Sequence, residues 1–181
     1  MAMPTAAKPV TSIEELLALP EDGLRHELLD GEHVVTPSPT WGHQDLLARL
    51  YDVVRPAIVD RPELKLRWSP ADIVLGPRTL VQPDLFVVRI NPAAPPTSWA
   101  EAGIPVLAIE VLSPGTASRD RGKKRRLYQQ AGVAEYWIVD PEQRLIVRWR
   151  PEDTEPEVLR EHLTWELEGT RLVTVEVGAL F

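Results

Sequence analysis

The chain has 181 residues, of which 44% are hydrophobic and 26% charged, a composition typical of a single globular domain. Its net charge of −7 argues against a protein that coats nucleic acid through overall electrostatics. The absence of cysteine excludes disulfides, thiolate nucleophiles and cysteine-ligated zinc. No apolar run approaches the roughly 18 residues of a membrane span. Because the amino terminus also lacks a signal-peptide pattern, we expect a cytoplasmic protein without membrane segments.

The first third of the chain predicts two helices and a hairpin. The first helix begins at Thr11 or Ser12 and ends at Pro20. A hairpin follows over residues 26–35, with an Asp-Gly pair at its turn. Leucine, valine and isoleucine then recur at helical spacing over residues 43–59, which predicts an amphipathic helix.

The rest of the chain alternates strands with one helix. Strand-like runs cover residues 64–75, 80–89 and 106–112. A helix over residues 116–132 leads to two further strands within residues 135–150. A strand, helix and strand in this order predict two parallel strands joined by a right-handed crossover. We therefore expect an α/β fold with a mixed sheet flanked by helices.

Glu110 is unusual because it lies in a strand that is otherwise apolar on both faces. A buried carboxylate needs a cation, a strong donor or a metal. Asp84 begins another apolar run directly after Pro83, and an Asp in that place is more often part of a turn than a ligand. Two such acids at neighbouring strand ends suggest a divalent cation between them, and oxygen ligands favour magnesium or manganese over zinc.

The predicted helix over residues 116–132 directs one lysine toward the sheet. Lys124, Leu127 and Tyr128 share a stripe, which Asp120 extends by one turn. Lys124 is therefore a candidate partner for Glu110. The alternative is a solvent-exposed ion pair between Asp120 and Lys124, which would stabilise the helix by roughly a few tenths of a kcal/mol. Spacing alone does not decide between the two interpretations.

Several segments together resemble one family. "QPD", "IEVLSPGT" and "RDRGKKRRLYQQAGVAEYWIVDP" follow in an order and spacing similar to the Uma-type family of putative restriction endonucleases, a branch of the PD-(D/E)XK nuclease superfamily. "HELLDGE" near the start, a "GH" pair opening the second helix and a Leu-Phe ending extend the resemblance over nearly the whole chain. The resemblance implies a restriction-endonuclease-like fold, with residues 11–181 as one nuclease-like domain after a disordered segment, 1–10.

The resemblance also implies site residues. Asp84 matches the metal-binding Asp of the superfamily, and Glu110 matches its second acid. The lysine expected two residues later is absent, and Lys124 matches the place to which it moves in this family. Glu27 matches a recurrent acid near the start of the fold, and the backbone carbonyl of Val111 would assist Asp84 and Glu110 in holding Mg²⁺ or Mn²⁺.

The implied activity is metal-dependent hydrolysis of DNA, for which a homodimer would suit cleavage of both strands. The basic segment around Lys124 would contact the phosphodiester backbone through Arg121, Lys123, Arg125 and Arg126, although a charge run is more often a solvated helix face. Two alternatives stay open, a catalytically silent binding protein with a nuclease fold and a metal-dependent phosphodiesterase acting on RNA or a small substrate. His43 is interpreted as a helix-entry or structural residue, since the histidines show no zinc-site spacing.

Overall fold

The computed structural model of this protein describes residues 9–181. Residues 1–8, the larger part of the segment for which we predicted disorder, lie outside this range. The helical segments are α1 (Ile13–Leu17), α2 (Trp41–Ala57), η1 (Trp99–Glu101), α3 (Ala117–Arg119), η2 (Asp120–Lys124), α4 (Arg125–Gln130) and η3 (Val177–Leu180). The strands up to the crossover are β1 (Arg25–Leu29), β2 (Glu32–Thr36), β3 (Leu64–Trp68), β4 (Ile73–Gly76), β5 (Thr79–Val81), β6 (Leu85–Arg89) and β7 (Leu107–Val111). Those after it are β8 (Glu135–Asp140), β9 (Leu145–Trp149), β10 (Glu157–Leu159), β11 (His162–Leu167) and β12 (Thr170–Glu176).

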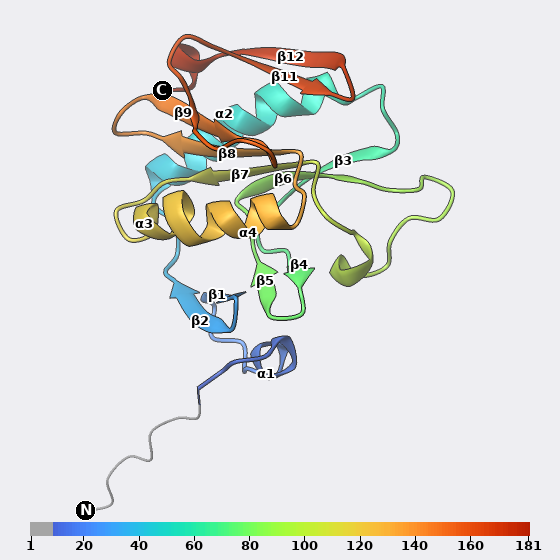
Figure 1. Ribbon diagram of the computed structural model, residues 1–181, viewed down its shortest axis with the longest axis vertical. Coiled ribbons are helices and arrows are strands. Elements are labelled where there is room, and N and C mark those ends of the chain that lie inside the picture. Colours follow the sequence, from blue (N-terminus) through green and yellow to red (C-terminus); the bar gives the residue numbers. More distant parts are fainter. Residues whose placement is uncertain (1–8) are drawn as a thin grey trace, which may run out of the picture.

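A six-stranded sheet with the order β10-β9-β8-β7-β6-β3 forms the centre of the molecule. The strands β7 and β8 are parallel and the other neighbours are antiparallel, which confirms the predicted mixed sheet. In Figure 1, α2 and the β11-β12 hairpin lie on one side of this sheet, and α3 and α4 lie on the other. The predicted α/β fold with flanking helices is therefore confirmed.

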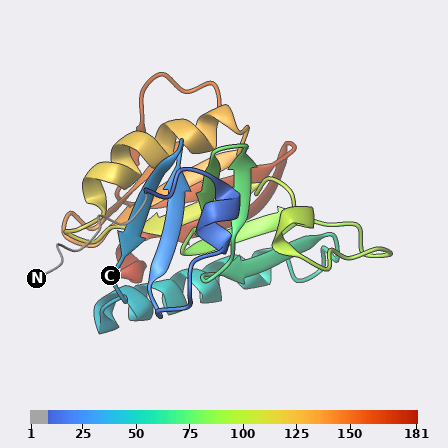
Figure 2. The ribbon, with the colours of Figure 1, turned by 90° about the horizontal axis from the view of Figure 1, so that it is seen from below.

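A second sheet of four strands, in the order β2-β1-β5-β4, lies beside the first. Its β1-β2 hairpin is the predicted one, and Asp30 and Gly31 at its turn both have positive φ, as this tight turn requires. Figure 2, which views the molecule from below, shows these strands between α2 and the α3–α4 segment. Glu27, a carboxylate of β1 in this hairpin, is buried and lies 2.8 Å from Lys124 of the crossover segment.

Prolines divide two of the predicted strand runs. The run 64–75 forms β3 and β4, with Pro70 between them, and the run 80–89 forms β5 and β6, with Pro83 between them. Proline has no backbone N–H to donate to a sheet ladder, so the chain leaves one sheet and enters the other at these points. Both runs form strands, as predicted, but each run is divided into two strands that belong to different sheets.

The crossover helix is not a regular α-helix. Its middle, η2, is a π-helical turn between the short helical segments α3 and α4. The α-helical spacing assumed from the sequence is therefore wrong at this point. Lys124 nevertheless points inward as predicted, because Tyr128 one turn later is fully buried on the same side. A wider turn of this kind is common at functional sites.

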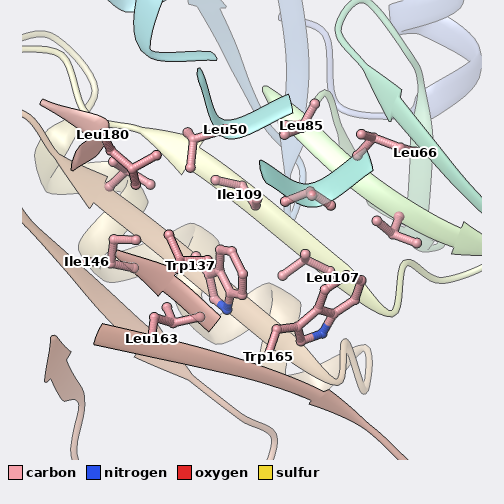
Figure 3. Close-up of a cluster of buried hydrophobic side chains, with 14 of the residues drawn as sticks. Leu50, Leu66, Leu85, Leu107, Ile109, Trp137, Ile146, Leu163, Trp165 and Leu180 are labelled. Carbon is pink, nitrogen blue, oxygen red and sulfur yellow. The ribbon is translucent and has the colours of Figure 1, made fainter. Parts of the chain in front are cut away.

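The central strands are buried on both faces. Leu107, Ile109 and Val111 of β7 belong to the core under α2, while Ala108 and Leu112 belong to the core under α4. Figure 3 shows the first of these cores, in which the rings of Trp137 and Trp165 meet edge to face. The carboxyl-terminal strands β10, β11 and β12, for which no element was predicted, supply part of this core.

No helix within residues 9–181 has the length and apolar character needed to cross a lipid bilayer.

Replacing Ile109 by Ala tests the central packing. Ile109 is fully buried in β7, so the substitution is expected to lower the free energy of unfolding by about 2–5 kcal/mol, measured by urea denaturation. Val158→Ala is the control, since Val158 in β10 is 53% exposed and should change that free energy by less than about 0.5 kcal/mol. Equal losses for the two variants would contradict this packing.

Candidate active site

Lys124 is the centre of a group of buried charges. Its ammonium lies 2.7 Å from Oε1 of Glu110 and 2.8 Å from Oε1 of Glu27, and its side chain is 2% exposed. Asp120, one turn earlier in η2, is 4.0 Å away and equally buried. The alternative of a solvent-exposed Asp120–Lys124 pair is therefore wrong. Lys124 instead connects the crossover helix with β1 and β7.

Glu110 accepts a second hydrogen bond from the hydroxyl of Tyr128, at 2.9 Å. Glu27 accepts one from the backbone N–H of Gln82, also through Oε1, at 2.8 Å. Each of these carboxylates thus has a cationic partner and a neutral donor, as burial requires. The sequence indicated the lysine, whereas the contribution of the Tyr128 hydroxyl was not predicted.

Asp84 lies beside Glu110 because of the register between β6 and β7. The antiparallel pairs are Phe86 with Ala108 and Leu85 with Ile109, so one further step along both strands places Asp84 opposite Glu110. Oδ2 of Asp84 accepts the backbone N–H of Val111 at 2.9 Å. The two acids expected to share a site therefore meet at the end of β7.

The side chains of Arg25 and His43 contact the carboxylate of Asp84. Nη1 of Arg25 is 2.6 Å from Oδ1 of Asp84, and Nε2 of His43 is 3.2 Å from Oδ2. Burial opposes ionisation of Asp84, but the hydrogen bond from His43 and the charge of Arg25 outweigh it and lower its pKa to about 2. Both residues were missed as partners of Asp84. The "GH" pair at the start of α2 was the sequence feature that could have indicated a role for His43, but it does not show where the helix packs.

Negative charge exceeds positive charge in this group, which we call the buried charge cluster. Within the described residues it comprises four carboxylates and two cations: Glu27, Asp84, Glu110, Asp120, Arg25 and Lys124. Burial raises the pKa of Glu110 and the charge of Lys124 lowers it; with the charges of Asp84, Asp120 and Glu27, which also raise it, the pKa lies at about 8. The pKa of Lys124 is also raised, since the three carboxylates around it outweigh its burial. The cluster thus holds two permanent cations, Arg25 and Lys124, and has an excess of two negative charges when every acid is ionised.

The donor atoms suit a small divalent cation. Mg²⁺ is usually held by one or two carboxylates together with water and phosphate oxygens, and Asp84 and Glu110 provide two carboxylates side by side. Among residues 9–181, no group of three or more histidine, aspartate or glutamate side chains is placed to enclose a metal ion. Arg25 and Lys124 occupy that region and compensate part of its charge.

An open cleft reaches Asp84 from the side of α2. It has a volume of about 650 Å³. The residues that line it come from the start of β1, the segment after β2, one side of α2, the end of β3 and the segment from β5 into β6, and they include Arg25, His43, Trp68 and Asp84. We call this space the Asp84 cleft. Glu27, Glu110 and Lys124 are not part of its lining and lie behind Asp84.

Two of the predicted phosphate-binding residues form ion pairs within the protein. Arg121 contacts the carboxylate of Asp140 at the end of β8. Lys123 lies 2.6 Å from Glu32, at the start of β2. Both pairs join the crossover helix to a strand, so part of the local positive charge is already compensated.

The other two basic residues differ from each other. Arg125 packs over the ring of Trp149, with its guanidinium carbon 4.6 Å from the ring centre. Arg126 is exposed and has no ion-pair partner within the described part of the chain. The structure thus places Arg121 and Arg126 at the surface, and Lys123 and Arg125 in partly buried contacts.

Comparison with known proteins agrees with the resemblance found in the sequence. Residues 13–178 match Uma2, which is described as a putative restriction endonuclease. The chain belongs to the Uma2 family. A crystal structure of a putative nuclease belonging to DUF820, from Anabaena variabilis ATCC 29413, is similar in fold, with a TM-score of 0.79 and 19% identity. The similarity covers 94% of this chain and 97% of that one. No curated protein matches this chain.

The raised pKa of Glu110 predicts an unusual dependence of stability on pH. An unfolded chain releases this proton near pH 4.5, whereas the folded protein retains it to about pH 8. Between these values the folded state binds the extra proton, so raising the pH lowers the free energy of unfolding. Glu110→Gln removes this contribution, and the variant should gain stability relative to the original protein as pH rises from 5 to 8, approximately.

Urea denaturation in EDTA at several pH values measures this difference. Glu152→Gln is the matched control, because Glu152 is exposed in the segment between β9 and β10. Parallel pH profiles for Glu110→Gln and the original protein would contradict the raised pKa.

Proposed function

We propose that this protein is a metal-dependent endonuclease that hydrolyses phosphodiester bonds in DNA. The observation that carries the proposal is the buried charge cluster, in which Asp84 and Glu110 lie side by side, Lys124 contacts Glu110, and Asp84 lines an open cleft. Structural ion pairs normally balance their charges, whereas this cluster leaves two negative charges uncompensated once Glu110 is ionised. Membership of the Uma2 family supports the same activity.

Asp84 and Glu110 would hold one or two Mg²⁺ or Mn²⁺ ions, with the backbone carbonyl of Val111 as a third ligand. A bound divalent cation lowers the pKa of a coordinated water and neutralises charge that develops on the phosphate. Asp84 is suited to this role because its low pKa keeps it ionised at neutral pH. Glu110 would release its proton when a cation binds, since the cation replaces the proton as its compensating charge.

Lys124 would keep its proton throughout the reaction. Its raised pKa makes it a fixed positive charge beside Glu110. From that position it would orient the attacking water or stabilise the negative charge of the transition state. Glu27 contacts the same ammonium and would fix its position, which makes Glu27 a positioning residue.

The surface of the crossover helix would contact the phosphodiester backbone. Arg126 and Arg121 are exposed, and Lys123 and Arg125 would add to the local positive potential. A homodimer would bring two such sites to a duplex and allow cleavage of both strands.

Cleavage of supercoiled plasmid tests the activity. Nicking is expected with Mg²⁺ or Mn²⁺ and not with EDTA, and it should be lost in Asp84→Ala and Lys124→Ala by about a hundredfold or more, as typical for groups that stabilise a transition state. Asp45→Ala is the control, because Asp45 is an exposed carboxylate of α2 that pairs with Arg49 away from the cluster.

Each result has a distinct meaning when plasmid, single-stranded DNA and RNA are compared. Loss of cleavage in both cluster variants with full activity in Asp45→Ala supports the proposal. Cleavage of RNA alone indicates a phosphodiesterase of different substrate class. Inactivity of the original protein on all three substrates contradicts the enzymatic proposal and favours a binding protein with a nuclease fold.

Metal binding can be measured without turnover. Because a ligand that binds only the folded state stabilises it, Mg²⁺ or Mn²⁺ should raise the Tm of the original protein. Asp84→Asn should abolish this rise, and Asp45→Asn should retain it. The rise should be larger at pH 8 than at pH 6, since Glu110 must lose a proton to bind a cation and its pKa is about 8. Equal rises for the two variants would indicate that the cation binds elsewhere.

A further inference from the structure

The Asp84 cleft has an aromatic wall beside Asp84, the proposed metal ligand. Trp68 is the last residue of β3 and pairs with Leu85, which directly follows Asp84. The Trp68 side chain shares a face of β3 with Leu66, toward α2, while the intervening Arg67 belongs to the other face. Trp68 and Asp84 therefore lie on neighbouring strands and line the same cleft.

The Trp68 ring is both exposed and held in place. Its residue is 55% exposed, although it is large and apolar. Tyr51 of α2 meets it edge to face, with ring centres 5.6 Å apart, and Tyr51 is itself held by a 2.9 Å hydrogen bond from Arg55. One face of an indole supported in this way is available for a planar ligand.

Hydrogen-bonding atoms without partners gather around the same cleft. Within residues 9–181, five buried side-chain polar atoms have no hydrogen-bond partner, and three of them belong to residues of the cleft: Oγ1 of Thr36, Nδ1 of His43 and Oε1 of Gln82. Buried polar atoms are normally paired, so a concentration of unpaired ones in one cleft indicates a ligand that pairs with them. A hydroxyl, an imidazole nitrogen and an amide oxygen can pair with the edge of a heterocyclic base once a small shift of the surrounding side chains exposes them, since each atom is buried in this structure.

The cleft has little positive charge for a phosphate backbone. Arg25 is the permanently charged basic residue in its lining, and Nη1 of Arg25 already lies 2.6 Å from Oδ1 of Asp84. Apolar residues form much of the remaining lining, among them Leu24, Leu47 and Pro70. A lining that is mostly apolar with a few polar groups is typical of small-molecule and base-binding sites, and a surface for duplex DNA is typically basic.

We propose that the Asp84 cleft binds an unpaired nucleobase, which stacks on Trp68 and places its phosphate at Asp84. A base within a continuous duplex has both faces covered by its neighbours, so only a single-stranded, frayed or extruded nucleotide can stack in this way. The inference rests on the proposed nuclease activity for its biological meaning and extends it to the substrate: nucleic acid that is single-stranded at the point of cleavage.

Binding of labelled oligonucleotides tests the proposal independently of cleavage. Three fluorescein-labelled probes are used: a dT12 strand, a strand of the same length with abasic sites in place of bases, and a dT12·dA12 duplex. The binding of each probe is measured by fluorescence anisotropy in EDTA and again in Ca²⁺. The original protein should bind dT12 about tenfold more tightly than the duplex or the abasic strand, the range expected for stacking of one base. A uridine 12-mer reports whether DNA and RNA share the site.

The variants separate stacking from general effects. Trp68→Ala should weaken dT12 binding about tenfold, and Trp68→Phe should retain most of the affinity. Trp41→Ala is the matched control, because Trp41 is 89% exposed at the start of α2 and is not part of the cleft lining. Thr36→Val should weaken binding by about threefold to tenfold without lowering the Tm, since the hydroxyl it removes has no partner in the protein.

The outcomes distinguish this inference from the proposed function. Preference for dT12 that depends on Trp68 supports the cleft as a base-binding site, even when no plasmid is nicked. Equal binding of dT12 and duplex, a Trp68→Ala variant that binds like Trp41→Ala, or no binding of dT12 overturns it, even when nicking is observed. A drop in Tm confined to Trp68→Ala is resolved by Trp68→Phe and Thr36→Val, which test the same cleft with smaller changes.

Discussion

The buried ammonium of Lys124 is the interaction on which the site depends. A lysine removed from water requires compensating carboxylates, and here Glu27 from β1 and Glu110 from β7 both lie within 2.8 Å of it. These contacts join the four-stranded sheet, the central sheet and the crossover helix at one point. Loss of any partner would leave a buried charge unpaired, so the fold and the charge arrangement are maintained together.

This arrangement gives neighbouring acids opposite properties. Asp84 receives donors from His43, Arg25 and Val111 and stays ionised, while Glu110, which burial removes from water and the neighbouring carboxylates repel, retains a proton to about pH 8. Such divergent pKa values in adjacent groups are typical of catalytic sites. A divalent cation is the simplest species that would balance the excess charge, because it would replace the proton on Glu110.

Asp84 lies at the boundary between the buried charge cluster and the cleft. The cluster is closed behind it by Glu27, Glu110 and Lys124, and the cleft opens in front of it toward α2 and Trp68. A substrate can therefore approach Asp84 from one side only. In the proposed function, the acidic net charge of the protein would not prevent action on a polyanion, since the contact at Asp84 would be local and would involve a base, a phosphate and a cation.

The sequence by itself determined the features that depend on local spacing. Glu110 stands out because its strand is apolar on both faces, and the helical stripe through Tyr128 indicated that Lys124 points inward even though a π-helical turn interrupts the helix. Contacts across long separations, such as those of Arg25 and His43 with Asp84, depend on how β1 and α2 pack against the central sheet. The tertiary structure alone decided these contacts and the cleft, because no periodicity in the chain encodes which distant surfaces meet.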